Sequence, residues 1–234
     1  MCPRHLPVFA HPGRSVSELG MFPELNNLLN ISPDRAEQGK LTLLCDSKTD
    51  GSFLVHHFLS FYLKANCKVC FVALLQSFSH YNTVGQKLGV NLTTARERGQ
   101  LVFLEGLKSS VDIFFHPQEE PHPLRFLRET SAGSLQPLYE FVREALKPVD
   151  SEDTTWRFPV LLVDDLSVLL SLGLGAVAVL DFTHYCRATV CSELQLKILW
   201  RKSTGRRDRS LIYQYKIQDK NVSFFAKGMS PAVL

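Results

Sequence analysis

No stretch of this sequence is apolar for long enough to cross a membrane. The richest one, residues 158–180, is interrupted by Asp164, Asp165 and two glycines, so it falls short of the roughly 18 apolar residues that a spanning helix needs. The first fourteen residues contain no continuous apolar segment of the kind found in a secretory signal. We therefore expect a protein without a membrane partner, located in the cytoplasm or the nucleus.

Cysteine content and net charge are also low. The chain of 234 residues has six cysteines and a formal net charge of +3. These values argue against a disulfide-rich secreted domain and do not by themselves indicate nucleic-acid binding. Cys67 and Cys70 have the spacing of a zinc or redox pair, but no second pair is present and a closed zinc site needs four ligands. We interpret both as small core residues and expect no metal site.

The composition is that of a folded domain. Apolar residues make up 45% of the chain and charged residues 21%, which are ordinary values for a globular protein with a core. Residues 1–20 differ, because they are rich in Pro, Gly, Ser and Arg and have no periodicity. This composition predicts a flexible extension. A regular pattern begins at Met21, so we expect a single domain over residues 21–234.

Short apolar runs alternate with helical patterns along most of the chain. Near-continuous apolar runs of this kind are typical of strands buried on both faces of a sheet. They occur at residues 41–45, 69–75, 101–104 and 159–163. Helix-type spacing occurs between them, at residues 52–64, 83–88, 135–146 and 176–194. The alternation predicts an α/β fold with a mostly parallel sheet flanked by helices.

The C-terminal part changes to a period of two. Alternating apolar residues occur at 196–200 and 211–217, and a further short apolar run follows at 222–226. This pattern predicts an antiparallel ribbon that closes one edge of the sheet.

Residues 40–63, KLTLLCDSKTDGSFLVHHFLSFYL, have the outline of a phosphate-binding loop between a strand and a helix. In the template G-x-x-x-x-G-K-[ST], the lysine contacts phosphate and the hydroxyl holds Mg²⁺. With Gly51 as the second glycine, Asp46 replaces the first one, Ser52 replaces the lysine and Phe53 replaces the hydroxyl residue. We interpret the segment as a strand–turn–helix packing unit in which Asp50 or Ser52 caps the helix. An ATPase with an atypical loop remains the alternative.

The run FPVLLVDDLSVLL places Asp164 and Asp165 after a buried strand. In a nucleotide hydrolase such a pair would hold Mg²⁺ and orient a water molecule. The structural interpretation is that Asp165 caps the helix that begins at Leu166. Together with the altered loop, this second motif indicates a RecA-like core that has lost its chemistry, without catalytic residues and without a cofactor.

Two further groups of polar residues could have a functional role. His56 and His57 follow the loop, but neighbouring helical positions point about 100° apart, so the two cannot chelate one ion. A basic run occupies the segment predicted to connect two strands, and it contains Arg201, Lys202, Arg206, Arg207 and Arg209. It is either a solvated hairpin tip or a contact for the phosphate backbone of RNA.

Long blocks of the chain resemble the vertebrate family of Elongator complex protein 6. They include FPELNNLLN, RAEQGKLTLLCDSKTDGSFLVHHFLSFYLKANCKVCFVAL, FPVLLVDDLSVLLSLG and YQYKIQDKNVSFFAKGMSPAVL. The resemblance implies a non-catalytic RecA-like subunit that joins the fourth and fifth Elongator proteins in a hetero-hexameric ring. Such a ring binds tRNA and serves the catalytic Elongator subunits, which modify the wobble uridine at position 34 of tRNA.

The chain departs from this family between Cys191 and Leu196, where relatives have a longer insert that includes a sheet strand. We therefore expect one core strand to be missing. Unpaired backbone groups next to a missing strand would cost roughly 1–3 kcal/mol each. Either the fold is marginal, or the ribbon slides into the gap. Three functions follow as alternatives: a non-catalytic ring subunit, an atypical ATPase and a stand-alone RNA-binding module.

Overall fold

The structure is a computed structural model of the whole chain. It describes residues 22–28, 31, 41–46, 50–115, 122–127, 134–147, 156–189, 197–203, 213–218 and 221–226. Within these ranges, no helix combines the length and the apolar character that crossing a bilayer would require.

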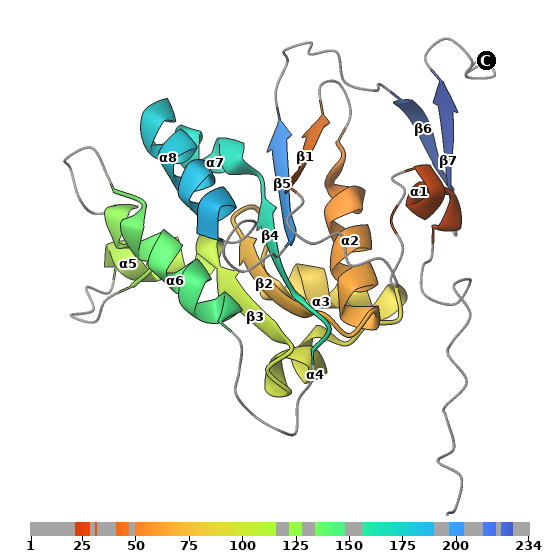
Figure 1. The fold of residues 1–234 in the computed structure, drawn as a ribbon, viewed down its shortest axis with the longest axis horizontal. Helices are drawn as coiled ribbons and strands as arrows, with labels where there is room; N and C mark the ends of the chain where they lie inside the picture. The colour runs from red at the N-terminus through yellow and green to blue at the C-terminus, as the bar shows by residue number, and fades with distance from the viewer. Residues whose placement is uncertain are drawn as a thin grey trace, which may run out of the picture.

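The described residues form an α/β fold built on a parallel sheet of five strands (Figure 1). The strands of this sheet are β1 (Leu41–Asp46), β2 (Lys68–Ala73), β3 (Leu101–Glu105), β4 (Pro159–Asp164) and β5 (Lys197–Ser203). Their order across the sheet is β1-β5-β4-β2-β3, and each neighbouring pair is parallel. The helices are α1 (Pro23–Leu28), α2 (Ser52–Lys64), α3 (Phe78–Lys87), α4 (Leu92–Glu97), α5 (Gly106–Phe115), α6 (Gln136–Leu146), α7 (Leu166–Ser171) and α8 (Ala176–Cys186), with a short 3₁₀ turn at Arg125–Leu127.

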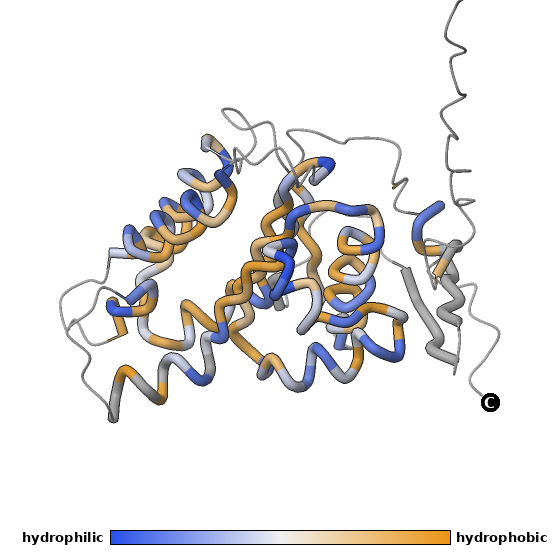
Figure 2. The backbone as a smooth tube through the Cα atoms, turned by 90° about the horizontal axis from the view of Figure 1, so that it is seen from below, coloured by the Kyte–Doolittle hydropathy of each residue, from blue (hydrophilic) through white to orange (hydrophobic). Residues whose placement is uncertain are grey.

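The helices cover the two faces of the sheet, and each face has its own core. On one face, α2, α3 and α4 pack against alternate residues of β2 and β4, including Val69, Phe71 and Leu162. On the other face, α5, α6, α7 and α8 pack against the intervening residues, including Cys70, Val72 and Leu161. Figure 2 shows this arrangement in the hydropathy of the residues. The central strands are mostly apolar, whereas the outer helices alternate between apolar and polar residues. A parallel strand that is buried on both faces needs such a continuous apolar run.

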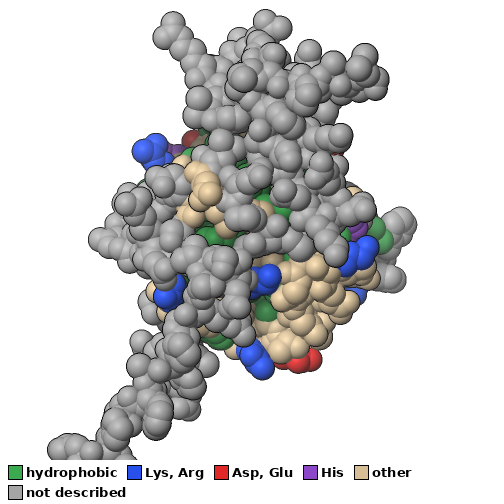
Figure 3. Space-filling view, turned by 90° about the vertical axis from the view of Figure 1, so that its right-hand side faces the viewer, with side chains coloured by type: hydrophobic (Ala, Val, Ile, Leu, Met, Phe, Trp, Pro, Cys, Tyr) green, Lys and Arg blue, Asp and Glu red, His purple; other side chains and the backbone are tan. Residues whose placement is uncertain are grey.

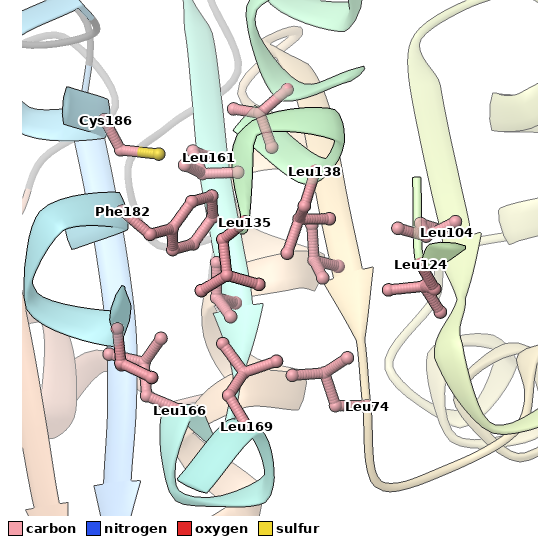
Figure 4. Close-up of a cluster of buried hydrophobic side chains, with 14 of the residues drawn as sticks. Leu74, Leu104, Leu124, Leu135, Leu138, Leu161, Leu166, Leu169, Phe182 and Cys186 are labelled. Carbon is pink, nitrogen blue, oxygen red and sulfur yellow. The ribbon is translucent and has the colours of Figure 1, made fainter. Parts of the chain in front are cut away.

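The core beneath α5, α6, α7 and α8 is covered by more helices than the core on the other face. Figure 4 shows Leu135 and Leu138 of the α6 region facing Leu161 of β4, with Phe182 and Cys186 of α8 beside them. The predicted helix over 135–146 and the four predicted early strands are confirmed to within two residues at each end. Cys67 and Cys70 are both buried and lie in opposite cores, as the interpretation of small core residues requires.

The prediction for residues 196–200 was wrong. They were expected in the antiparallel ribbon, but β5 lies in the parallel sheet between β1 and β4, with Leu41 opposite Ile198 and Val163 opposite Trp200. β5 therefore fills the position where a core strand was expected to be missing. One strand of the expected ribbon has moved into the gap, while β6 and β7 lie outside this sheet. The physical reason is that pairing on both sides satisfies backbone groups of β1 and β4 that an empty position would leave buried.

The last two strands form a separate sheet. β6 (Tyr213–Gln218) pairs antiparallel with β7 (Asn221–Ala226), and neither joins the five-stranded sheet. The expectation that this ribbon closes an edge of the parallel sheet was therefore wrong. β7 contacts α1 instead, on the far side of α2 from the sheet (Figure 1).

Candidate nucleotide-type site at the carboxyl edge of the sheet

The altered loop and the acidic pair lie at the same edge of the sheet. β1 ends at Asp46 and β4 ends at Asp164. Both strands run parallel within one sheet, so their carboxyl ends open towards the same side. Ligands of open α/β sheets bind in the crevice outside these ends. Both motifs therefore lie at the edge of the sheet where ligands of such folds bind.

The start of α2 is already bonded to an acidic side chain. The carboxylate of Asp50 accepts hydrogen bonds from the backbone N–H of Ser52 at 2.9 Å and from the Ser52 hydroxyl at 2.8 Å. The expectation that Asp50 or Ser52 is the N-cap was wrong, because Gly51 holds that position and the Asp50 carboxylate instead bonds to Ser52 from one residue further out. Free N–H groups at a helix N-terminus are what binds phosphate in a working loop. A carboxylate of the chain itself now lies at the first of these groups.

The first turn of α2 supplies neither a cation nor a metal-binding hydroxyl at the template positions. It reads Ser52, Phe53, Leu54 and Val55 after the buried Gly51, which is the helix N-cap. Phe53 is half-buried, and its aromatic ring cannot ligate Mg²⁺. Within the described ranges, no group of three or more His, Cys, Asp or Glu side chains is arranged to hold a metal ion.

Asp164 accepts a hydrogen bond from a tyrosine of α3. The hydroxyl of Tyr81, on α3, donates a hydrogen bond to Asp164 Oδ2, and the two side chains are 2% and 1% exposed. A carboxylate that would hold Mg²⁺ in a nucleotide hydrolase is here buried in contact with a neutral donor. No pattern in the sequence indicates this contact, because Tyr81 and Asp164 are 83 residues apart.

Asp165 has a different role from its neighbour. Its side chain accepts a hydrogen bond from Ser167 N–H at 2.8 Å, and it is the N-cap of α7. The predicted cap is confirmed. Its backbone is left-handed, with φ 55°, a conformation that Asp adopts more readily than most residues. The acidic pair is thus divided between a buried hydrogen bond and a helix cap.

The side chains of the two adjacent histidines of α2 point in different directions and have different neighbours, as expected. The ring of His56 lies 5.3 Å from that of His80 and 4.9 Å from that of Tyr81, which places it beside the buried Asp164 contact. His57 points away and bonds through Nε2 to Asn26 Oδ1 of α1 at 2.8 Å. Burial, with a smaller effect from Lys64, lowers the pKa of His57 to about 4, so the ring is neutral at pH 7.

The basic run is only partly described. Arg201 and Lys202 were predicted on a loop, but they lie within β5, opposite Leu44 and Cys45 of β1. Arg206, Arg207 and Arg209 lie outside the described residues. Figure 3, which faces the right-hand side of Figure 1, shows Lys and Arg side chains of the described residues standing singly on that face rather than in one patch.

Comparison with known proteins identifies close relatives. A family model described as Elongation complex protein 6 matches residues 22–199. Elongator complex protein 6 from Homo sapiens is 65% identical over 92% of this chain and its own full length. The same protein from Xenopus laevis is 52% identical and that from Danio rerio 44%, with the same coverage of both chains.

These relatives contain residues that this chain lacks. The alignment with the human protein extends over 266 residues, of which 92% of this 234-residue chain supplies about 215, so roughly 50 positions have no residue here. The relatives are matched over their full length, and the unmatched positions therefore lie inside the alignment. A shortened chain was expected from the sequence, at residues 191–196, which lie outside the described residues.

Proposed function

Because the chain belongs to the family described as Elongation complex protein 6, we propose that it is a non-catalytic subunit of the Elongator complex. Its relatives are named as proteins of that complex. The carboxyl edge of the sheet supports a role without catalysis. The two acidic groups that would serve a nucleotide, Asp164 and Asp165, accept hydrogen bonds from the chain's own donors, namely Tyr81 and Ser167.

A more detailed proposal follows from the resemblance of the sequence to this family. The chain occupies a hetero-hexameric ring with the fourth and fifth Elongator proteins, in the cytoplasm or nucleus. The ring binds tRNA and supports modification of the wobble uridine at position 34 by the catalytic subunits. The five parallel strands, with the loop after β1 and the acidic pair after β4, support a RecA-like domain over residues 21–234 without working nucleotide motifs. Residues 1–20 form an extension that this domain does not need.

The hydrogen bonds between Asp50 and Ser52 at the start of α2 are the observation that carries the proposal. A triphosphate would have to displace the Asp50 carboxylate from the first turn of α2, and that turn offers it no cation. Two unit charges of like sign at 4 Å repel by about 4 kcal/mol at an effective dielectric constant of 20. The strand–loop–helix unit is retained because it packs the sheet, and the surface around it is free to serve as an interface.

Co-purification with the two presumed ring partners tests this function. We expect the full chain, co-expressed with the fourth and fifth Elongator proteins, to give one species whose native mass equals two copies of each subunit. The human relative, expressed in the same way, is the matched control. A chain that stays apart from both partners while the human protein assembles would contradict ring membership.

A stand-alone RNA-binding module is the second candidate, and the basic run favours it. In that case the isolated chain would bind tRNA with an affinity that falls steeply with salt. We propose Arg206 and Arg207 as phosphate contacts, together with Arg201, Lys202 and Arg209. Replacing Arg206 and Arg207 by Ala would then flatten the salt dependence. If only the assembled ring binds tRNA, the ring subunit is favoured over the module.

A further inference from the structure

The β6–β7 ribbon is too small to be stable by itself. It has two strands of six residues each, and neither strand joins the five-stranded sheet. An isolated two-stranded hairpin is marginally stable at best in water, so the ribbon needs a packing partner. The most extensive contact that either strand makes with another described element is that between β7 and α1. Figure 1 shows α1 and the ribbon together, on the outer side of α2.

The helix α1 is also too short to be stable alone. It spans six residues, Pro23–Leu28, and isolated helices shorter than about 12–15 residues are marginal in water. Its Leu25 is nevertheless only 1% exposed, so this helix is held by packing. α1 and the ribbon thus each supply a packing surface that the other needs.

The contacts between α1 and the rest of the fold converge on His57 of α2. Asn26 Oδ1 bonds to His57 Nε2 at 2.8 Å, and the ring of Phe22 lies 5.6 Å from that of His57. His57 is 3% exposed, so the hydrogen bond lies in a buried interface, where such a bond is stronger than in water.

We propose that α1 and the β6–β7 ribbon form one cooperative unit, a strap across the outer side of α2 that opens as a whole while the five-stranded sheet stays folded. Proteins open locally in cooperative units of this kind, and units with few buried contacts open most easily. The described members of both cores of the sheet lie between Ile31 and Cys186, so the strap can leave without dismantling either core. Its opening uncovers His57. The strap joins the beginning of the fold to its end, and it does not depend on ring membership.

Hydrogen exchange of the full chain at graded urea concentrations, measured by mass spectrometry, tests the strap. The amide of Ile31 reports on the end of α1, because it donates a hydrogen bond to Asn26 O at 2.9 Å. We expect the amides of Asn26 and Ile31 to share one opening free energy with those of the ribbon, below that of β2 and β4. Separate openings of α1 and the ribbon, or opening of both only together with β2 and β4, would overturn the proposal.

A change in α1 should release the ribbon. Asn26→Ala removes the partner of the buried His57, and we expect it to speed exchange of the ribbon amides at least about tenfold while those of β2 stay unchanged. Asn27→Ala is the matched control, because Asn27 is the exposed neighbour in the same helix. Ribbon amides that exchange at the wild-type rate in Asn26→Ala would contradict the strap.

A change in the ribbon should likewise release α1. Lys216 lies opposite Ser223, and the two-residue connection after Gln218 puts Lys216 at a hydrogen-bonded position of the ribbon. Lys216→Pro removes that donor, so we expect faster exchange at Ile31 although α1 itself is unaltered. Lys216→Ala keeps the donor and is the control. A variant that releases only the element it alters would show two independent elements instead of one strap.

Discussion

The hydroxyl of Tyr81 donates a hydrogen bond to Asp164, joining α3 to the end of β4 across 83 residues of sequence. Both side chains are buried. The contact holds a carboxylate that a nucleotide hydrolase would give to Mg²⁺. It therefore joins α3 to the sheet through a buried contact in which a donor of the chain itself occupies that carboxylate.

Removal of this hydroxyl should destabilise the protein. Tyr81→Phe leaves a buried carboxylate without one of its donors, and we expect the free energy of unfolding to fall by about 1–3 kcal/mol. Urea unfolding followed by circular dichroism measures the loss. Tyr185→Phe, at an exposed tyrosine of α8, is the control and should be neutral. Equal stability of the Tyr81→Phe variant and the wild type would mean that the bond contributes nothing.

The sequence predicted the order of helices and strands along the chain, but not the sheet positions of the C-terminal strands β5, β6 and β7. Strands β1 to β4 could be identified from their near-continuous apolar runs, which in β2 and β4 reflect burial on both faces, and α2 from the apolar run that follows the loop. β5 could not be placed, since alternating residues at 196–200 suit an edge ribbon and the choice of partner depends on distant strands. Tyr81 was missed for the same reason, because its partner is far away in the chain.

Acidification should weaken the fold through His57. Burial lowers the pKa of His57 to about 4 from its ordinary value of 6.5, so the unfolded chain binds one more proton between these pH values. The free energy of unfolding therefore falls as the pH falls from about 6.5 to about 4, by roughly 3 kcal/mol from this group. Urea unfolding as a function of pH measures it.

The variant His57→Gln isolates this effect. It keeps a donor for Asn26 but cannot titrate, so its stability should decline less than that of the wild type over the same pH range. His184→Gln, at an exposed position of α8, is the control for the replacement of a histidine by glutamine. Parallel profiles for the wild type and His57→Gln would show that His57 is not the titrating group.

The Asp50 carboxylate at the start of α2 should also contribute to stability. Asp50→Ala removes the acceptor for Ser52 N–H and its hydroxyl, and we expect a loss of about 0.5–1.5 kcal/mol, as for other hydrogen bonds. Asp50→Asn retains an acceptor and should recover most of it. Thermal denaturation of the wild type, Asp50→Ala and Asp50→Asn measures these differences in stability. If Asp50→Asn is as unstable as Asp50→Ala, the hydrogen bonds seen at the start of α2 are not what stabilises it.

Gly106 joins β3 directly to α5 and should not tolerate a side chain. A Cβ atom there would lie 2.8 Å from a methyl carbon of Leu74 and 2.9 Å from the carbonyl oxygen of Ala73. We expect Gly106→Ala to cost about 1–3 kcal/mol, as for other overpacked sites. Gly175→Ala, where no atom lies within 4 Å of the added Cβ, is the control and should be nearly neutral. A neutral Gly106→Ala would mean that the connection can move apart without loss.

Nucleotide binding is the property that the loop should no longer have. Calorimetric titration of the full chain with ATP and Mg²⁺ measures it, and we expect no binding heat at millimolar nucleotide, for the wild type and for Asp164→Ala alike. Micromolar binding that disappears in Asp164→Ala would contradict a closed site and would make the chain an atypical ATPase rather than a subunit that acts through its surface.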